Sequence, residues 1–304
     1  MTLQKYNALS DQLSDTQYLS VEMRDALPVI LVRHTDFSAD LAIQGAQLLR
    51  FAVQSEEWLW LSETAEYKTG TSLRGGIPIC WPWFGDAAKN PSSVTAHIIG
   101  DNSPAHGFAR SQDWSLTSVA ESDSDIALSL SLENPAHPAW NGEASLLLEI
   151  TMSASALTLA LTTTAGQKEV TVSQALHTYF PTTDIKQTSI AGLEDESYVD
   201  AIDGWTTKPQ TGPVAFTEET DRIYTVTGDL TLKSPGSTMT LSGNNRTAIV
   251  WNPWIDKAAR LSQFENDAWK RMFCVESADV MDAAVSLQPG ESHTLRMTLV
   301  NRSI

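Results

Sequence analysis

The chain has 304 residues, of which 42% are hydrophobic, so it is long enough to bury a sizeable core. Its 20 basic and 37 acidic residues give a formal net charge of -17. This balance argues against binding to nucleic acid or to an anionic membrane surface, because both need clustered Lys and Arg. The same acidic field repels phosphorylated metabolites at long range, so any phosphate site must be locally basic.

The first twenty residues lack the apolar stretch of a signal peptide, and they could hold a turn of helix. No later apolar run approaches the length of a transmembrane helix. The two cysteines, Cys80 and Cys274, lie far apart and outside any zinc-type spacing. They could form a disulfide, but two thiols in a chain of this length are more typical of a reducing compartment. We therefore expect a cytoplasmic protein.

The segment from residue 74 to residue 85, RGGIPICWPWFG, is unlike an ordinary strand or helix. Its prolines remove backbone donors, and its paired glycines allow a close approach of the backbone to a ligand. A stiff aromatic loop with Arg74 at its edge suits a small polar ligand that carries an anionic group. The other interpretation is an aromatic corner that plugs the end of a sheet. These residues alone favour neither.

Apolar residues then alternate with polar ones over long stretches, at 126–132, 146–152, 157–161 and 295–299. This period of two predicts strands with one buried face, and the Thr and Ser residues between them predict an opposite face that meets water or a second layer. We find no fixed repeat and no linker long enough to divide domains. The sequence therefore predicts an all-β protein, with residues 1–304 forming a single large antiparallel β-sandwich.

Helical patterning is scarce. The best candidate runs from Lys257 to Met272, where apolar residues recur at intervals of three and four. We expect one short helix there.

Three residues stand out as candidates for acid–base chemistry. His106 lies in a Pro-Ala-His-Gly-Phe context, and His177 follows the strand-like 170–172 segment, so it should lie on or at the end of a strand. Glu276 follows an apolar run, which suggests burial and a raised pKa. Taken singly, each has an ordinary interpretation, because a lone histidine is usually a packed side chain and a strand-ending glutamate is usually solvated.

Two other functions remain open from the residues alone. A cupin-like metal site would need closely spaced ligands such as His-x-His, and the chain has no such spacing, so we expect no metal. A carbohydrate-binding module without catalysis would use exposed tryptophans such as Trp81, Trp83, Trp251 and Trp254 to stack on sugar rings. No nucleotide-binding glycine motif appears, so we expect no nucleotide cofactor.

Several of these segments, in this order, resemble the hexose-6-phosphate mutarotases, which are the glucose-6-phosphate 1-epimerases of the aldose 1-epimerase superfamily. The matching segments are RGGIP (74–78), WPWFG (81–85), HGFAR (106–110), LHTYF (176–180), DRIY (221–224), VWNPW (250–254) and CVE (274–276). They span roughly residues 70 to 280. Together they are specific, although each alone is weak.

The resemblance implies a galactose-mutarotase-like β-sandwich that uses no cofactor and acts on the anomeric carbon of a hexose 6-phosphate. It implies His177 as general acid and Glu276 as general base. The substrate contacts that it implies are Arg74, His106, Arg110 and Asp200.

The chain departs from the family pattern at two positions. Ala105 stands where many members have Gln, and Ala201 stands where many have Lys. The first change removes an amide and the second removes a possible partner for an anion. An aldose 1-epimerase acting on unphosphorylated sugar therefore remains an alternative, as does a sugar-binding sandwich without catalysis.

Overall fold

The computed structural model describes residues 2–226 and 228–302, and the ladders between the strands named below are antiparallel. A five-stranded sheet contains the first strands in chain order. Its strands are β1 (Leu19–Arg24), β2 (Leu27–Arg33), β3 (Phe37–Ala42), β4 (Gln47–Val53) and β5 (Glu56–Glu57).

The largest sheet has nine strands and supplies one whole layer of the sandwich. In spatial order its strands are β17 (Val214–Ala215), β14 (Ser189–Ala191), β19 (Leu230–Ser234), β20 (Ser237–Gly243), β24 (Ser292–Asn301), β10 (Leu157–Ala165), β9 (Ala144–Ser153), β8 (Asp125–Leu132) and β7 (Ser115–Glu121).

An eight-stranded sheet contains the strands that matter most for function. In spatial order these are β16 (Thr206–Pro209), β15 (Ser197–Asp200), β18 (Thr220–Thr225), β21 (Thr247–Asn252), β22 (Met272–Asp279), β12 (Gln174–Leu176) and β6 (Ile79–Cys80), and β13 (Tyr179–Pro181) also pairs with β22. A small two-stranded sheet joins β11 (Val170–Val172) to β23 (Val285–Leu287).

Helices are few and short. The α-helices are α1 (Thr2–Gln12), α2 (Ser92–Thr95) and α3 (Trp254–Ala258), and the 3₁₀ turns are η1 (Ala87–Lys89), η2 (Ala109–Ser111), η3 (Ile185–Gln187), η4 (Ala268–Lys270) and η5 (Met281–Ala283). The prediction of helix in the first twenty residues is confirmed by α1. None of the helices in the described ranges is long and apolar enough to cross a membrane.

The alternating stretches fold as the sequence predicts. In the nine-stranded sheet, Leu128, Ile150, Leu159 and Met297 form one row across β8, β9, β10 and β24, and all four are buried. The opposite face carries hydroxyl pairs such as Thr162 with Thr294. The β-sandwich prediction is therefore confirmed, since apolar rows line one face and Ser and Thr line the other.

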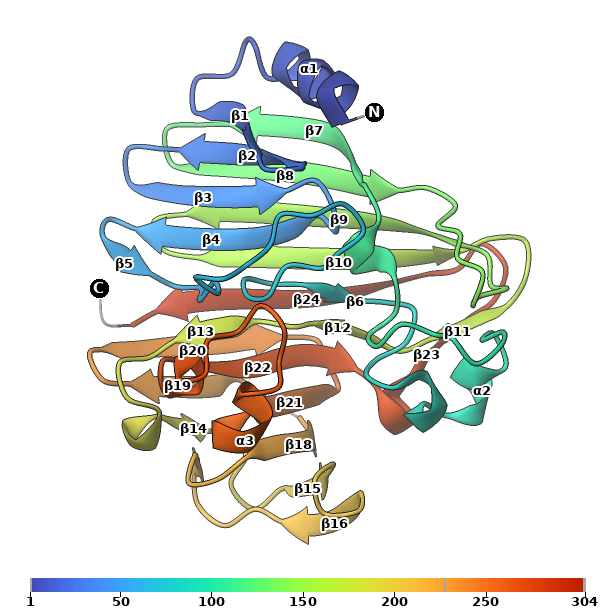
Figure 1. Cartoon of the computed structure of the whole chain (residues 1–304), viewed down its shortest axis with the longest axis vertical. Helices are drawn as coiled ribbons and strands as arrows, with labels where there is room; N and C mark the ends of the chain where they lie inside the picture. The colour runs from blue at the N-terminus through green and yellow to red at the C-terminus, as the bar shows by residue number, and fades with distance from the viewer. Residues whose placement is uncertain (1, 227, 303–304) are drawn as a thin grey trace.

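The two layers share one apolar core. In Figure 1 the five-stranded sheet overlies β7–β10, and β22 of the eight-stranded sheet overlies the nine-stranded sheet near β24. Buried side chains from α1 to β24 belong to one continuous cluster, from Leu9 to Leu299.

The predicted helix from Lys257 to Met272 is wrong in extent. Helix α3 ends at Ala258, and the chain then follows turns until η4. Its apolar residues still face the core, with Phe264 and Ala268 buried. Within these turns Gln263 takes a positive φ of 54°, which an α-helix does not allow, and donates its side-chain amide to the Ser72 carbonyl. Apolar residues at helical spacing can therefore be buried from an irregular segment.

In the loop before η2, the backbone packs very closely against the backbone of Trp81. His106 and Gly107 both have positive φ, 63° and 69°. Phe108 donates its N–H to the Trp81 carbonyl at 3.0 Å, so the chain at Gly107 lies directly against that carbonyl. A Cβ on Gly107 would collide with the Trp81 backbone.

We expect Gly107→Ala to destabilise the fold by about 3 kcal/mol or more, because left-handed strain adds to a backbone collision. Gly236, in the β19–β20 turn, also has a positive φ of 83° but has open space around its Cβ position. Gly236→Ala should therefore cost only about 1–2 kcal/mol. Urea unfolding of both variants measures the difference. Equal losses of unfolding free energy in the two variants would show that the collision with the Trp81 backbone does not add to the cost of Gly107→Ala.

Candidate active site

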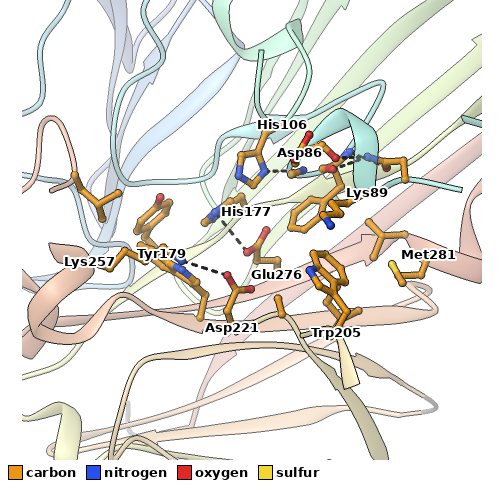
Figure 2. A pocket seen from close by; sticks show the side chains of 18 of the residues that line it. Asp86, Lys89, His106, His177, Tyr179, Trp205, Asp221, Lys257, Glu276 and Met281 are labelled. Carbon is orange, nitrogen blue, oxygen red and sulfur yellow. Dashed lines mark hydrogen bonds and ion pairs between the residues drawn. The ribbon is translucent and has the colours of Figure 1, made fainter. Parts of the chain in front are cut away.

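His177 and Glu276 lie opposite each other on neighbouring strands. β12 pairs Leu176 with Ser277 of β22, and β13 continues in the same register after a short break. This register brings His177 opposite Glu276. Their side chains meet, with His177 Nε2 3.4 Å from Glu276 Oε1, as Figure 2 shows. The sheet thus holds an imidazole and a carboxyl group side by side.

The segment from residue 74 to residue 85 supports the other edge of the His177 strand. The backbone N–H of His177 donates to the Pro78 carbonyl at 3.0 Å, and that of Tyr179 donates to Gly76 at 2.9 Å. The segment therefore fixes His177 through its backbone, and hydrogen bonds on both edges leave the strand little freedom to move.

Burial changes the ionisation of both groups. Desolvation, and then the positive charges of Arg110 and Arg74, lower the pKa of His177 to about 3. Desolvation, and then the nearby Asp221 carboxylate, raise the pKa of Glu276 well above its ordinary value, although Arg110 opposes this rise. Both shifts disfavour the charged forms, so burial favours a neutral imidazole beside a protonated carboxyl group, and the two groups share one proton.

Each member of the pair also has one polar atom without a hydrogen-bond partner among the described residues. His177 Nδ1 and Glu276 Oε2 are buried, and neither has a hydrogen-bond partner within the described ranges. Buried polar atoms are normally satisfied, so such exceptions often mark a binding or catalytic position.

His106 stands next to His177, with ring centroids 5.5 Å apart. Its Nδ1 accepts the Gly85 backbone N–H at 3.3 Å and lies 3.4 Å from the Cys80 sulfur. Burial, and then the charge of Arg110, lower the pKa of His106 well below its ordinary value. The neutral ring that results carries its hydrogen on Nε2, because Nδ1 acts as an acceptor. His106 is therefore a hydrogen-bond donor beside the pair.

These groups share a cavity of about 250 Å³. Its aromatic and apolar wall comes from Phe84, Tyr179, Trp205, Ile223, Trp251, Leu261, Val280 and Met281. Its charged and polar wall includes Arg74, Asp86, Lys89, Asn90, His106, His177, Asp221, Lys257 and Glu276. In the described part of the chain, no group of three or more His, Cys, Asp and Glu side chains is arranged to hold a metal ion.

The expectation that the whole aromatic segment forms a wall is corrected. Trp81 and Trp83 are fully buried in the core, where Trp81 packs edge-on against Trp140 at 4.9 Å. Only Phe84 and Gly85 at the end of the segment reach the cavity, together with Arg74 at its start. Two stiff indoles fill the sheet end, so the plugging interpretation holds for them. Neither can stack on a sugar, as the binding-module alternative required.

The predicted substrate contacts are placed unequally. Arg74 and His106 line the cavity, whereas Arg110 donates to the Ala105 carbonyl at 2.6 Å and acts on the histidines only through its charge. Asp200 does not line the cavity. Its carboxylate accepts Lys208 Nζ at 2.8 Å and the backbone N–H of Ile202 at 3.1 Å.

Asp221 supplies a cavity carboxylate that the sequence analysis did not predict. It comes from β18, the strand beside Asp200, and it lines the cavity. Burial raises its pKa, while Lys257 at 3.4 Å favours the charged form. Asp221 belongs to one of the segments that carried the resemblance, and that was the only sequence signal for it. No sequence pattern pointed to Lys89 or Trp205.

Both cysteines are buried and free. Cys80 touches His106 as described above, and burial raises the pKa of each thiol above its ordinary value. They are therefore un-ionised core residues, and the disulfide alternative is wrong.

Comparison with known proteins agrees with this geometry. The aldose 1-epimerase family matches residues 28–300. The chain is 34% identical to the "putative glucose-6-phosphate 1-epimerase" of Salmonella typhimurium and 32% identical to that of Escherichia coli, with 86% of each chain covered in both cases. The crystal structure of a "putative mutarotase" from Salmonella typhimurium superposes with a TM-score of 0.85 at 28% identity, over 94% of both chains. The galactose 1-epimerase of Lactobacillus acidophilus shares the fold, with a TM-score of 0.69 at 12% identity, over 94% of this chain and 98% of that one.

The chain belongs to the aldose 1-epimerase family. It is an isomerase of the mutarotase type, and the cavity around His177 and Glu276 is its candidate active site.

The buried carboxyl group of Glu276 should make stability depend on pH. Its pKa is raised in the folded state, so between the unfolded value of about 4.3 and the folded value only the folded chain keeps the proton. The wild type therefore loses stability as pH rises through this window. Glu276→Gln, which has no proton to lose, should gain at least about 1 kcal/mol relative to wild type between pH 4 and pH 8.

Thermal and urea unfolding across this pH range measure the effect. Glu133→Gln is the control, because Glu133 is exposed. A difference from wild type that stays constant with pH would show that Glu276 is already ionised in the folded protein.

Proposed function

We propose that the protein interconverts the α and β anomers of a hexose 6-phosphate, with glucose 6-phosphate as the expected substrate. The observation that carries the proposal is the buried His177–Glu276 pair, both members of which line one cavity. The basic side chains of that cavity, in a chain of strongly negative charge, support a phosphorylated substrate. The names of the two enterobacterial relatives support the same substrate.

The reaction requires one base and one acid at the same time. Opening the hemiacetal removes the proton from the C1 hydroxyl while the ring oxygen gains one. The free aldehyde turns about the C1–C2 bond and closes on its other face, with both roles reversed. A pair that shares a single proton suits this cycle, because each member must act once as acid and once as base.

The motif resemblance in the sequence implies Glu276 as general base and His177 as general acid. Burial favours the other tautomer, with the proton on Glu276, because both charged forms are desolvated. A bound sugar hydroxyl that hydrogen-bonds to the carboxylate lowers this difference. Binding of substrate then moves the shared proton to the imidazole and produces the reactive ion pair.

Neighbouring groups complete the reacting end of the cavity. His106 donates from Nε2 to a sugar oxygen, and Asp221 accepts hydrogen bonds from sugar hydroxyls. Burial raises the pKa of Tyr179 and the charge of Arg74 opposes this rise, and the Tyr179 ring stacks on His177 with centroids 4.7 Å apart. We therefore assign Arg74 to the orientation of the substrate near the acid–base pair.

Replacing either member of the pair should abolish most catalysis. We expect His177→Gln and Glu276→Gln each to lower the enzyme-catalysed rate of anomer exchange by about 10²–10⁴-fold. NMR exchange spectroscopy on α-glucose 6-phosphate measures this rate above the buffer background. His293→Gln is the matched control, since His293 forms its ion pair with Asp279 at 2.8 Å and does not line the cavity. Exchange at the buffer rate in wild type, or full activity in both variants, would refute the proposal.

The second candidate function is mutarotation of unphosphorylated aldoses, which the family membership favours. If the phosphate is recognised by one charge-assisted contact, kcat/KM for glucose 6-phosphate should exceed that for glucose by about tenfold or more. Equal values for the two sugars would favour the second candidate. Stabilisation by either sugar without exchange would instead favour a binding module.

A further inference from the structure

Three cations line the cavity, and they differ in how their charge is balanced. Lys257 Nζ lies 3.1 Å from Glu219 and 3.4 Å from Asp221, so two carboxylates neutralise it. Arg74 and Lys89 have no carboxylate partner in the part of the chain that the structure describes. Arg74 belongs to the reacting end, where it lines the cavity with His177 and Tyr179 and its charge acts on the pKa of both. Lys89 is therefore the cation that is free to meet an anionic ligand.

The loop that carries Lys89 is held in place by its own side chains. Asp86 caps η1 by accepting the Ala88 N–H at 3.0 Å. The Asn90 amide donates to the carbonyls of Phe84, at 2.8 Å, and Asp86, at 3.0 Å. The backbone at Lys89 is thus fixed on both sides, although its side chain is exposed at the mouth of the cavity.

The Lys89 ammonium lies against an aromatic ring from a distant part of the chain. Its Nζ is 5.8 Å from the centroid of Trp205, near the outer limit of a cation–π contact. Such a contact orients the ammonium but consumes none of its N–H donors in a hydrogen bond. In Figure 2, Lys89 and Trp205 lie on one side of Glu276 and Lys257 lies on the other.

Asp200 holds the turn that presents Trp205. Its carboxylate accepts the backbone N–H groups of Ile202, at 3.1 Å, and Asp203, at 3.2 Å, and its carbonyl accepts the Trp205 N–H at 3.0 Å. Asp200 therefore acts through Trp205 as a positioning residue.

Physical chemistry favours an anion at this mouth over one beside His177. Complete burial of a doubly charged phosphate is costly, whereas a partly exposed site keeps much of its hydration. The C6 phosphate of a hexose is carried outside the ring on a flexible CH₂–O arm, so it can remain at the mouth while C1 and the ring oxygen reach the pair.

We infer that Lys89, oriented by Trp205, binds the phosphate group of the substrate and makes the enzyme select phosphorylated over unphosphorylated sugar. This inference rests on the proposed function and names the residue that decides its substrate class.

The experiment compares Lys89→Gln with wild type on glucose 6-phosphate and on glucose, using NMR exchange spectroscopy. We expect KM for glucose 6-phosphate to rise about tenfold with kcat changed less than twofold, because the contact is equally strong in the ground and transition states. Exchange of glucose should not change. Lys89→Arg should restore most of the affinity.

Lys270→Gln is the matched control. Lys270 makes the same kind of contact, 5.7 Å from the Trp269 ring, but lies outside the active-site cavity. Arg74→Ala is the competing variant and should slow exchange of both sugars. The inference is overturned if Lys89→Gln leaves KM for glucose 6-phosphate unchanged, or if Arg74→Ala alone shows the phosphate-specific loss.

A binding measurement separates this inference from the proposed function. Titration of wild type and Lys89→Gln with glucose 6-phosphate by calorimetry reports the phosphate contact without catalysis. If wild type binds about tenfold more tightly than the variant but exchanges no anomers, the proposed reaction fails and the phosphate site stands. Equal affinities in a wild type that does exchange anomers would overturn the site alone.

Discussion

The site depends on one constraint, which is the burial of a carboxyl group opposite an imidazole in a single strand register. β22 is buried along its whole length, and β21 and the β12–β13 strand flank it. The pairing places the His177 and Glu276 side chains opposite each other, and both are buried. Folding of the sheet therefore desolvates two titratable groups. Desolvation disfavours the imidazolium–carboxylate pair relative to the neutral pair, and so sets the difference in free energy between these two protonation states.

The surrounding charges then balance the pair. Arg110 stabilises the ionised form of Glu276 and disfavours the imidazolium of His177, while Asp221 acts against ionisation of Glu276. Lys257 partly neutralises Asp221 in turn. These three charges lie on η2, β18 and α3, which are distant in sequence. Together they influence the position of the proton shared by His177 and Glu276. This is the arrangement that general acid–base catalysis by exchange of roles requires.

Sequence patterns predicted the parts of the fold in which two faces differ. β8, β9, β10 and β24 alternate because one face meets the core and the other does not. β21 and β22 are buried on both faces, so they show no alternation; the apolar run before Glu276 suggested its burial, and the family resemblance gave it a role. Resemblance also named Asp200, yet the cavity is lined by its neighbour in the sheet, Asp221. Composition alone could not show that Trp81 is buried, since a buried and an exposed indole look alike in sequence.

Sequence analysis did not identify Lys89 for a different reason. Its role depends on which aromatic and charged side chains lie near it in the folded structure. Two lysines of the cavity sit 5.8 Å from a tryptophan ring, Lys89 on Trp205 and Lys257 on Trp251. Lys257 is also paired with the carboxylates of Glu219 and Asp221, so its charge is neutralised within the protein. A chain with a net charge of -17 repels anions, and an unbalanced cation at the mouth offsets that field only locally. The cavity thus separates a buried end, where proton affinity is tuned, from a hydrated end, where a dianion can stay solvated.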